Sequence, residues 1–373
     1  MQNKDFSGSK GVQVALTLPS FARRTSPPLL GIDISSSGVK LVELSAGQKS
    51  PVCLQRYVIE PIERGAITDG NVENPEQVAE ALGRALRRMG TRTRDAALAM
   101  PSSAVITKRI TLPAGLTEED YELQVETEAS QYIPFAIEEV NLDFQILGPA
   151  PGASDEVEVL LAASRKEKVE DRVAVVEMCG LKPVVVDVDT YAARTALDHV
   201  AGLLPNQGQG QVIAVFDIGS AVTNVSVVLN GQTIFEREQA FGGQHLTQDL
   251  VRLYGLTPEE AELRKKTGDL PENYEADVLH PFVEQGAAEV ARALQFFFTS
   301  TPYARVDHIY LAGGSSVIPG LVEAIADRTQ VPTELLSPFR GMEIASNVRE
   351  KQLRLDAPAL LIACGLAMRR FDA

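Results

Sequence analysis

Two stretches of the chain share one arrangement of apolar and polar positions. In each, an apolar run ends on an aspartate, a short turn of small residues follows, and apolar residues then return at alternate positions. The stretches are residues 29–44 and 212–228. A short apolar run next to turn residues indicates a buried strand, and alternation indicates a second strand. Each stretch therefore predicts a β-hairpin with an aspartate at the end of its first strand.

The rest of the chain mixes predicted helices with predicted strands, which is typical of an α/β fold. Apolar positions on one stripe predict a helix at residues 75–88, and a capping pattern predicts one at 117–132. Further helices are predicted at residues 166–179, 257–266 and 358–370. Strands are predicted at residues 140–147, 157–163, 184–191 (a strand running into a helix) and 306–312, and as a pair within 95–112 that is interrupted at 101–103. A helical stripe of Val290, Ala293, Leu294 and Phe297 predicts a core-facing helix, and we expect the three consecutive phenylalanines at 296–298 in the core.

The turns of the two hairpins carry residues that suit a phosphate group. Small residues let the backbone approach a ligand closely, and their N–H and hydroxyl groups can donate hydrogen bonds to phosphate oxygens. An aspartate at a strand end can hold a hydrated Mg²⁺, and a lysine adds a positive charge. The candidate residues are Asp33, Ser35, Ser36, Ser37 and Lys40 in the first hairpin and Asp217, Gly219, Ser220 and Thr223 in the second. The alternative for each hairpin is an ordinary β-turn without a ligand.

A third element follows the hairpins along the chain. The predicted strand at 306–312 ends in Gly313 and Gly314, and Ser315 and Ile318 lead into a helix. Glycines would bring the backbone against a flat ligand beside the helix N-terminus, although a tight strand-to-helix turn alone would also explain them. Two phosphate hairpins followed by a glycine-rich turn predict two halves of the protein that hold one nucleotide.

With its motifs in this order, the chain resembles the actin-like ATPase superfamily and, within it, the PilM family of type IV pilus assembly proteins. The resemblance lies in residues 29–44, 65–86, 126–134, 184–196, 216–228, 241–249, 284–301, 311–321 and 358–368. It implies an α/β protein with the actin-like ATPase fold, in which two domains, each with a mixed sheet and helices, hold a nucleotide in the cleft between them. Ser35 departs from the pattern, since many relatives have glycine there, and this weakens the case for fast turnover more than the case for binding.

The same resemblance implies further ligand-binding residues. Gly242 and Gly243 would approach the phosphates, and Glu262 and Lys265 would lie near the ribose and adenine. The alternative for the last two is a salt bridge on an exposed helix, because they stand three residues apart. The implied ligand is ATP with Mg²⁺, and the metal would be held through water by Asp33 and Asp217. No catalytic residue is identified, so at most slow ATPase activity is expected.

The resemblance also divides the chain into segments. The expected segments are a flexible lead-in at 1–28, a first-domain core at 29–94 and 181–207, an inserted subdomain of the FtsA and PilM type at 95–180, a second-domain core at 208–243 and 306–356, its outer subdomain at 244–305, and a C-terminal helix at 357–373 that returns to the first domain. Asp189, in the returning segment, fits either a helix start or a place near the nucleotide.

A protein partner follows from the resemblance as well. It would be the cytoplasmic N-terminal tail of a PilN-like inner-membrane protein, lying in a groove between the first-domain core and the block at 95–180, and other proteins of the pilus motor or platform are also expected. Residues 132–135 are the candidate for one wall of this groove. The alternative is that they only contribute to the packing of the inserted subdomain. The chain would then be cytoplasmic and peripheral to the inner membrane. An FtsA-like division or polymerising ATPase, or a small-molecule kinase, is the alternative.

Composition narrows these possibilities. The chain has 373 residues, 45% of them apolar, which suffices for two domains with substantial cores. Its net charge of -15 argues against binding nucleic acid or anionic lipid by electrostatics. Three widely spaced cysteines and four histidines suggest neither disulfides nor a metal site. Residues 1–28 contain an apolar segment that is too short and too polar for an export signal. They are interpreted as a lead-in, and a weak partner-binding arm is the alternative.

Overall fold

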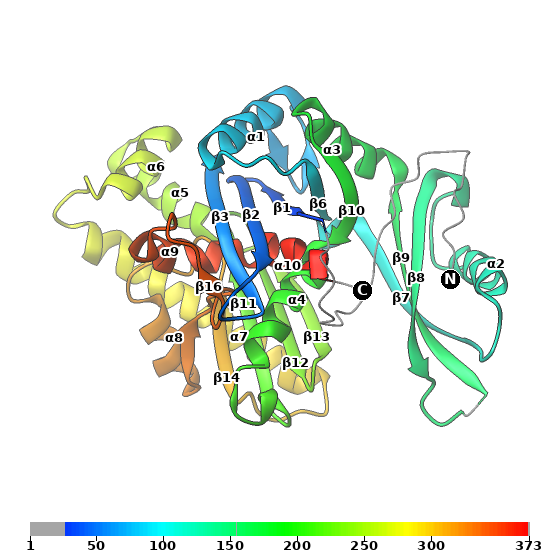
Figure 1. Ribbon diagram of the computed structural model, residues 1–373. Coiled ribbons are helices and arrows are strands. Elements are labelled where there is room, and N and C mark those ends of the chain that lie inside the picture. Colours follow the sequence, from blue (N-terminus) through cyan, green and yellow to red (C-terminus); the bar gives the residue numbers. More distant parts are fainter. Residues whose placement is uncertain (1–26, 154, 372–373) are drawn as a thin grey trace. The chain divides into compact units, whose positions relative to one another are not determined.

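The structure, a computed structural model, describes residues 27–153 and 155–371, and its chain forms two compact units (Figure 1). Of the described residues, unit 1 contains 27–153, 155–195 and 362–371, and unit 2 contains 196–361. The domain boundaries expected from the sequence, at 207/208 and 356/357, stay a prediction. The predicted lead-in at 1–28 lies outside the described residues except for its last two positions.

Unit 1 is built on a sheet whose strands in this unit follow the order β10-β6-β1-β2-β3. The strands are β1 (Leu30–Ser35), β2 (Gly38–Ala46), β3 (Val52–Pro61), β6 (Asp95–Met100) and β10 (Lys182–Val188). β1, β2 and β3 are antiparallel neighbours, whereas β6 runs parallel to both β1 and β10. A two-stranded ribbon of β4 (Ile67–Thr68) and β5 (Asn71–Val72) lies apart from this sheet.

Helices cover both faces of this sheet. Alternate residues of one strand point to opposite sides, and buried residues on each side pack against helices. Leu30 and Ile32 share a core with α1 (Pro75–Met89) and α3 (Lys166–Met178). Leu29 lies in a second core with residues of α4 (Asp189–Ala201) and α10 (Leu361–Met368). The predicted helices 75–88 and 166–179 are thus confirmed.

The backbone of α10 lies directly against β1 at Gly31. A Cβ atom at this position would stand 2.1 Å from the carbonyl oxygen of Ala363. Only glycine permits such an approach without moving the helix. The C-terminal end is also held by an ion pair, since Arg369 lies 2.6 Å from the fully buried Asp187 of β10.

A separate antiparallel sheet of order β7-β9-β8 forms the inserted part of unit 1. Its strands are β7 (Val105–Pro113), β8 (Val140–Pro149) and β9 (Glu156–Arg165), and α2 (Glu118–Ala129) packs on one face through Tyr121, Val125 and Ala129. This separate sheet spans residues 105–165, less than the expected block at 95–180.

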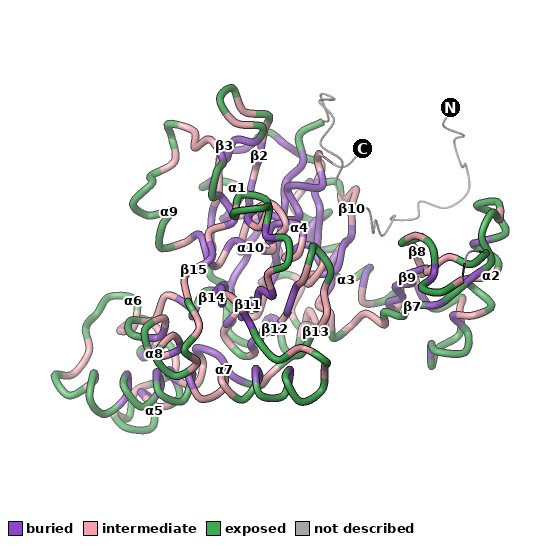
Figure 2. Tube along the Cα trace, turned by 90° about the horizontal axis from the view of Figure 1, so that it is seen from below, coloured by how far each residue is buried: buried purple, intermediate pink, exposed green. Residues whose placement is uncertain are grey.

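The prediction of paired strands within 95–112 is wrong in its pairing. β6 and β7 are both strands, but β6 pairs with β1 and β10, whereas β7 pairs with β9. The physical reason is visible in their burial. Residues 96–100 are all buried, as in a parallel strand covered on both faces, whereas β7 is largely exposed (Figure 2).

Unit 2 is built on a five-stranded sheet of order β13-β12-β11-β14-β15. Its strands are β11 (Val212–Ile218), β12 (Thr223–Leu229), β13 (Gln232–Gln239), β14 (His308–Ala312) and β15 (Thr333–Leu335). Its helices are α5 (Gly243–Tyr254), α6 (Pro258–Thr267), α7 (His280–Ser300), α8 (Leu321–Thr329) and α9 (Glu350–Asp356), and a two-residue strand, β16 (Glu343–Ile344), precedes α9. Residues of α5, α7 and α8 share one core with β11 and β14.

The expectation that three consecutive phenylalanines are buried is only partly right. Phe297 is fully buried, but Phe296 and Phe298 are 47% and 36% exposed. All three lie in α7, where consecutive residues point about 100° apart, so that only one of them can face the core. The predicted core stripe through Val290 and Phe297 is confirmed.

No helix in residues 27–153 or 155–371 combines the length and the apolar character that crossing a bilayer requires.

Candidate functional site

The first hairpin places Asp33 opposite Lys40 in the register of β1 and β2. The Nζ atom of Lys40 lies 2.8 Å from Oδ2 of Asp33, and only 5% of Asp33 is exposed. Ser35 donates a hydrogen bond from its hydroxyl to the carbonyl oxygen of Gly38 at 3.1 Å, so this hydroxyl stabilises the turn itself. Ser36 and Ser37 form the turn. The hairpin thus presents a carboxylate and an ammonium group side by side.

A second positively charged side chain, that of Arg172, lies in the same half of the candidate site, and the sequence analysis did not predict it. Arg172 of α3 is 5% exposed and donates hydrogen bonds to the carbonyl oxygens of Ile34 (3.2 Å) and Gly70 (2.7 Å). Burial lowers the pKa of Arg172, although the charges of Asp33 and Asp189 act in the opposite direction. The available signal was an arginine at a core position of a helix, three residues after the buried Val169.

Asp189 lies at the first residue of α4. Its Oδ1 accepts hydrogen bonds from the N–H of Thr190 at 2.7 Å and from the N–H of Ser102 at 3.0 Å. These contacts fit the helix-start alternative, and they also fix the turn after β6. The carboxylate remains electrostatically coupled to Arg172.

In unit 2, three turns that are far apart in sequence are held together by hydrogen bonds to backbone carbonyl oxygens. The carbonyl oxygen of Gly219, after β11, accepts from the N–H of Gly243 at 3.0 Å and from the hydroxyl of Ser315 at 2.8 Å. The carbonyl oxygen of Ser220 accepts from the N–H of Gln244 at 2.8 Å. The structure therefore brings the hairpin, the start of α5 and the glycine turn after β14 into one cluster.

Steric contacts explain why glycines occupy this cluster. A Cβ at Gly242 would lie 2.4 Å from the carbonyl oxygen of Ser220. Gly313 has a φ of 84°, and a Cβ there would lie 2.3 Å from the oxygen of Ile218 and 2.5 Å from Oδ1 of Asp217. At Gly314, by contrast, a Cβ would meet only Ala359, at 4.0 Å. Gly313 is therefore required by the fold, whereas Gly314 has open space beside it.

Two of the predicted residues have roles inside this cluster. Thr223 is 2% exposed, and its hydroxyl donates to the carbonyl oxygen of Phe241 at 2.7 Å, so it ties β12 to the residue before Gly242. Ile318 is partly exposed in the turn before α8, where its N–H donates to the carbonyl oxygen of Ser315 at 3.3 Å.

Glu262 and Lys265 of α6 join the same cluster and are more than an isolated surface pair. Lys265 Nζ lies 2.7 Å from Glu262, 2.6 Å from the hydroxyl of Thr247 and 3.4 Å from the carbonyl oxygen of Gly243. Burial raises the pKa of Glu262, but the charge of Lys265 and the hydrogen bonds from Lys265 and Thr247 outweigh it and hold this pKa below its usual value. The pair thus connects α6 to the start of α5.

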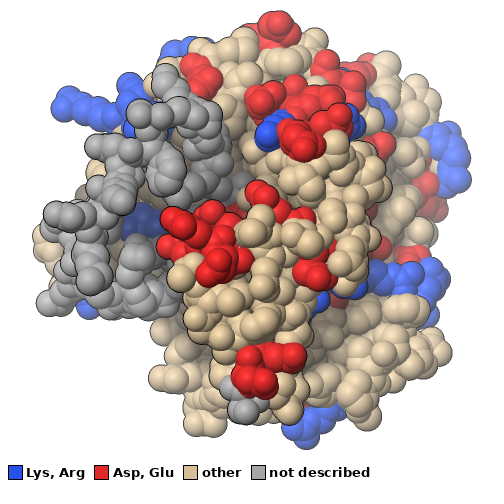
Figure 3. Space-filling model, turned by 90° about the vertical axis from the view of Figure 1, so that its right-hand side faces the viewer, with Lys and Arg blue, Asp and Glu red and all other residues tan. Residues whose placement is uncertain are grey.

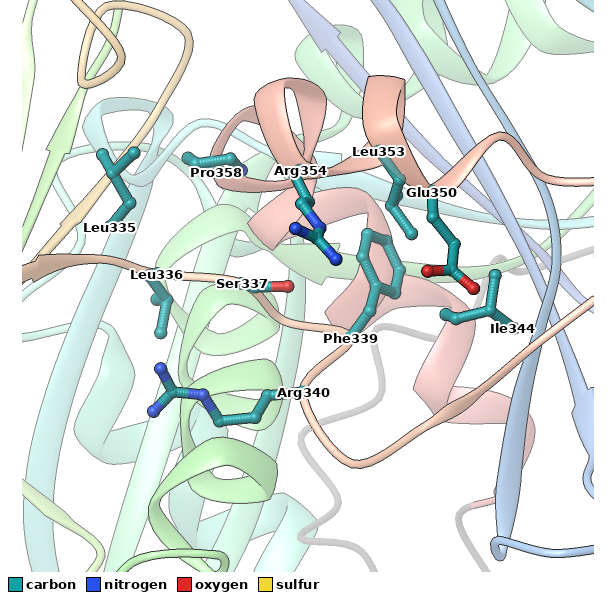
Figure 4. Close-up of a pocket in the computed structure, with 10 residues that line it drawn as sticks. All are labelled: Leu335, Leu336, Ser337, Phe339, Arg340, Ile344, Glu350, Leu353, Arg354 and Pro358. Atoms are coloured by element: carbon teal, nitrogen blue, oxygen red, sulfur yellow. The ribbon is translucent and has the colours of Figure 1, made fainter.

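A cavity of about 250 Å³ lies near the glycine turn in unit 2 (Figure 4). Pro358 lines it, and the carbonyl oxygen of Pro358 accepts a hydrogen bond from the N–H of Gly313 at 2.8 Å. Its other walls are mainly apolar, with three charged side chains, and are formed by Leu335, Leu336, Ser337, Phe339, Arg340, Ile344, Glu350, Leu353 and Arg354. None of the predicted residues lines this cavity. The signal that could have found it is the position of Leu335 at the carboxyl end of β15, where α/β sheets bind ligands.

No group of three or more metal-ligating side chains occurs within residues 27–153 and 155–371. Asp33 and Asp217 belong to different units, so neither unit alone brings the two carboxylates together. Asp33 lies two residues before the end of β1 and Asp217 one residue before the end of β11, so each stands close to its hairpin turn, a position that suits contact with a hydrated Mg²⁺.

Two α/β units, each with a hairpin that follows an aspartate at a strand end, define a protein with the actin-like ATPase fold. The particular family is shown by a family model described as "Type IV pilus assembly protein PilM", which matches residues 31–371. The chain belongs to the PilM family of type IV pilus assembly proteins.

The chain is also similar to solved structures and to a curated protein. The structure "PilM-PilN type IV pilus biogenesis complex" has a TM-score of 0.77 and 29% identity, covering 94% of this chain and 100% of that one. The ethanolamine utilization protein EutJ from Carboxydothermus hydrogenoformans shares the fold, with a TM-score of 0.55, 17% identity and 95% and 93% coverage. EutJ of Escherichia coli K12 is 31% identical over 157 residues, which are 41% of this chain and 51% of EutJ, so the chain spans about half the length of that relative.

Proposed function

We propose that the chain is an ATP-binding scaffold of the type IV pilus assembly platform, and that it binds the cytoplasmic tail of a PilN-like membrane protein. The observation that carries the nucleotide part is the cluster of three turns in unit 2, held together through the carbonyl oxygen of Gly219. Turns packed this closely leave a backbone surface without side chains, which a phosphate chain can approach. The PilM family membership supports the pilus part.

In this proposal, charged residues of unit 1 and backbone groups of unit 2 hold one Mg-ATP. Lys40 contacts the phosphates, and Arg172 adds positive charge behind Asp33. Asp33 and Asp217 hold Mg²⁺ through its water ligands, and the metal supplies charge that neutralises the phosphates. Gly314 lines the adenosine, because its neighbourhood is open, and the apolar cavity beside Pro358 takes the base end.

Calorimetric titration with Mg-ATP tests this assignment. Asp33→Asn and Asp217→Asn should each lower the affinity at least about a hundredfold, since each removes a charge that faces the metal. Asp249→Asn, a change in an exposed ion pair of α5, is the matched control and should bind ATP like the parent. Undiminished affinity in both site variants would contradict the proposal.

The tail would bind to the inserted part of unit 1. The solved relative contains PilN, and this chain exposes two aromatic side chains near its β7-β9-β8 sheet, Tyr132 (41%) and Phe135 (40%). Lys108 and Arg165 stand over these rings, 4.9 and 5.2 Å from their centroids. β7 and β8 are the outer strands of their sheet, so an extended peptide could pair with one of them and place side chains against the aromatic residues.

This part needs a test by substitution, because removing residues 95–180 would also remove β6 from the main sheet. A synthetic N-terminal peptide of the PilN-like protein from the same organism should bind the intact chain with ATP present. Tyr132→Ala combined with Phe135→Ala should weaken it at least about tenfold.

Phe296→Ala is the matched control, since Phe296 is 47% exposed and has Arg237 over its ring at 4.3 Å. Equal losses in both variants, or none in either, would reject the tail site while leaving ATP binding untouched. A chain bound through such a tail would be cytoplasmic and peripheral to the inner membrane.

A further inference from the structure

The helix α3 lies between the nucleotide half-site of unit 1 and the proposed tail site. It follows β9 directly, and it contacts α1 and β10 as well as β8 and β9 of the inserted sheet (Figure 1). Arg165, the residue before the helix, stands over the ring of Phe135. Arg172, seven residues later, reaches the hairpin that carries Asp33. At about 1.5 Å per residue, the two arginines are about 10 Å apart along the helix.

The start of α3 holds the segment that forms the proposed tail site. Lys166, the first residue of the helix, donates a hydrogen bond from its ammonium group to the carbonyl oxygen of Glu138 at 2.7 Å. Glu138 stands three residues after Phe135, whose ring centroid lies 5.2 Å from the guanidinium of Arg165. A displacement of the start of α3 would therefore move the backbone and the ring against which the tail would lie.

The middle of α3 is anchored to the nucleotide half-site by Arg172. This side chain is 5% exposed and donates hydrogen bonds to the carbonyl oxygens of Ile34 and Gly70. Burial lowers the pKa of Arg172, and the negative charges of Asp33 and Asp189 counteract this effect. The electrostatic energy of the buried guanidinium therefore depends on the charges around Asp33.

ATP would change those charges. Without it, the ammonium group of Lys40 lies 2.8 Å from the carboxylate of Asp33. In the proposed complex Lys40 contacts the phosphates and Asp33 faces the hydrated metal ion, so that Arg172 meets a different set of charges. A ligand shifts a conformational equilibrium only when its interactions differ between the two states, and Arg172 provides such a difference.

We propose that α3 couples the two sites, so that Mg-ATP and the partner's tail each increase the affinity of the chain for the other. This coupling rests on the proposed function and regulates it. ATP fixes Arg172 and with it the start of α3, which orders Phe135 for the tail, and the tail orders the same helix from its other end. The second ligand then loses less conformational entropy on binding. Arg172 is thus a positioning residue for the tail site.

Calorimetric titrations of the full chain test the coupling with the N-terminal peptide of the PilN-like protein and the non-hydrolysable analogue AMPPNP with Mg²⁺. Saturating AMPPNP should raise the peptide affinity at least about fivefold, and the peptide should raise the AMPPNP affinity by the same factor, because coupling is reciprocal. Unchanged affinities would overturn the coupling and leave the proposed function intact. If either ligand does not bind at all, the proposed function of that site fails, and the coupling fails with it.

General charge attraction is the competing explanation. Acidic side chains gather in patches on the side shown in Figure 3, which carries α2 and the inserted sheet. A basic tail is attracted to them, and bound nucleotide adds negative charge, but such long-range attraction is screened at about 0.5 M salt. The fivefold increase should persist there. A factor that falls to one would overturn the role of α3.

A variant locates the coupling at Arg172. Arg172→Lys keeps the positive charge but lacks the planar fork that reaches two carbonyl oxygens. The ratio of peptide affinities with and without AMPPNP should fall to about one, whatever the affinity of this variant for AMPPNP alone. Glu170→Gln, at an exposed position of the same helix, is the matched control and should keep the ratio of the parent. A purely structural role of Arg172 would lower stability but leave the ratio unchanged, and that result would overturn the proposal.

Amide hydrogen exchange of the unaltered chain supplies a measurement that does not depend on the folding of a variant. AMPPNP alone should slow exchange in residues 166–178, and so should the peptide alone. The peptide should not slow exchange in α8 of unit 2. Unchanged exchange in α3 with either ligand would overturn the proposal.

Discussion

The two hairpins share one sequence pattern but stabilise their surroundings in different ways. In unit 1 the hairpin is held by charged side chains: Asp33 and Lys40 form an ion pair at 2.8 Å, and the buried Arg172 lies close to Asp33. In unit 2 the hairpin packs closely against two other turns, which donate hydrogen bonds to the carbonyl oxygens of Gly219 and Ser220. The two hairpins should therefore be sensitive to different substitutions. The hairpin of unit 1 should be destabilised by the loss of a charge, and the hairpin of unit 2 by a larger side chain.

The largest effect is expected from added volume in unit 2. Gly313→Val should lower the free energy of unfolding by about 3 kcal/mol or more, because φ is 84° and the new Cβ would overlap the oxygen of Ile218. Gly314→Val is the matched variant: it should unfold at nearly the parent temperature and still fail to bind ATP. Thermal unfolding with ATP titration separates the two. If Gly314→Val binds ATP normally, this turn does not line the adenosine.

A change of charge in unit 1 should have the next largest effect. Lys40→Met leaves the buried carboxylate of Asp33 without its closest cation, which should lower the free energy of unfolding by about 1–3 kcal/mol. The double variant with Asp33→Asn should recover most of that stability but not ATP binding. Denaturation by urea measures the free energy of unfolding, and calorimetry measures ATP binding. A double variant no more stable than Lys40→Met would show that the unpaired carboxylate of Asp33 does not cause the loss of stability.

The smallest effect is a pH dependence in unit 2. The ionised form of Glu262 is stabilised by Lys265, so its folded-state pKa lies below the usual 4.5. The contribution to stability is fully present above pH 4.5 and is lost as the pH falls through the lower folded-state pKa. Glu262→Gln should therefore be slightly less stable than the parent at pH 7, and the difference should shrink below pH 4.5. Because the side chain is 44% exposed, solvent screening keeps the effect small, and a difference that grows in acid would contradict this account.

Much of the local structure could be predicted from the sequence. Apolar runs and turn residues located both hairpins, an apolar stripe located α1, and a capping pattern located α2 within a few residues. The helix predicted at 166–179 also matches α3 closely. These features depend on neighbours along the chain, because strand and helix periods and cap residues act within one or two turns. The residue types of the candidate site followed from the same local patterns, and their ligand remains a prediction.

What the sequence could not determine are the contacts between distant segments. β6 and β7 are separated by only a short turn, yet they belong to different sheets. The side chains of Asp187 and Arg369, 182 residues apart, meet in a fully buried ion pair.

The same limit applies within the candidate site. The tertiary structure alone placed Arg172 beside Asp33 and joined Gly219 to Ser315. No local pattern encodes such pairs, because each forms only when whole sheets and helices pack, and many distant partners are compatible with the same local sequence.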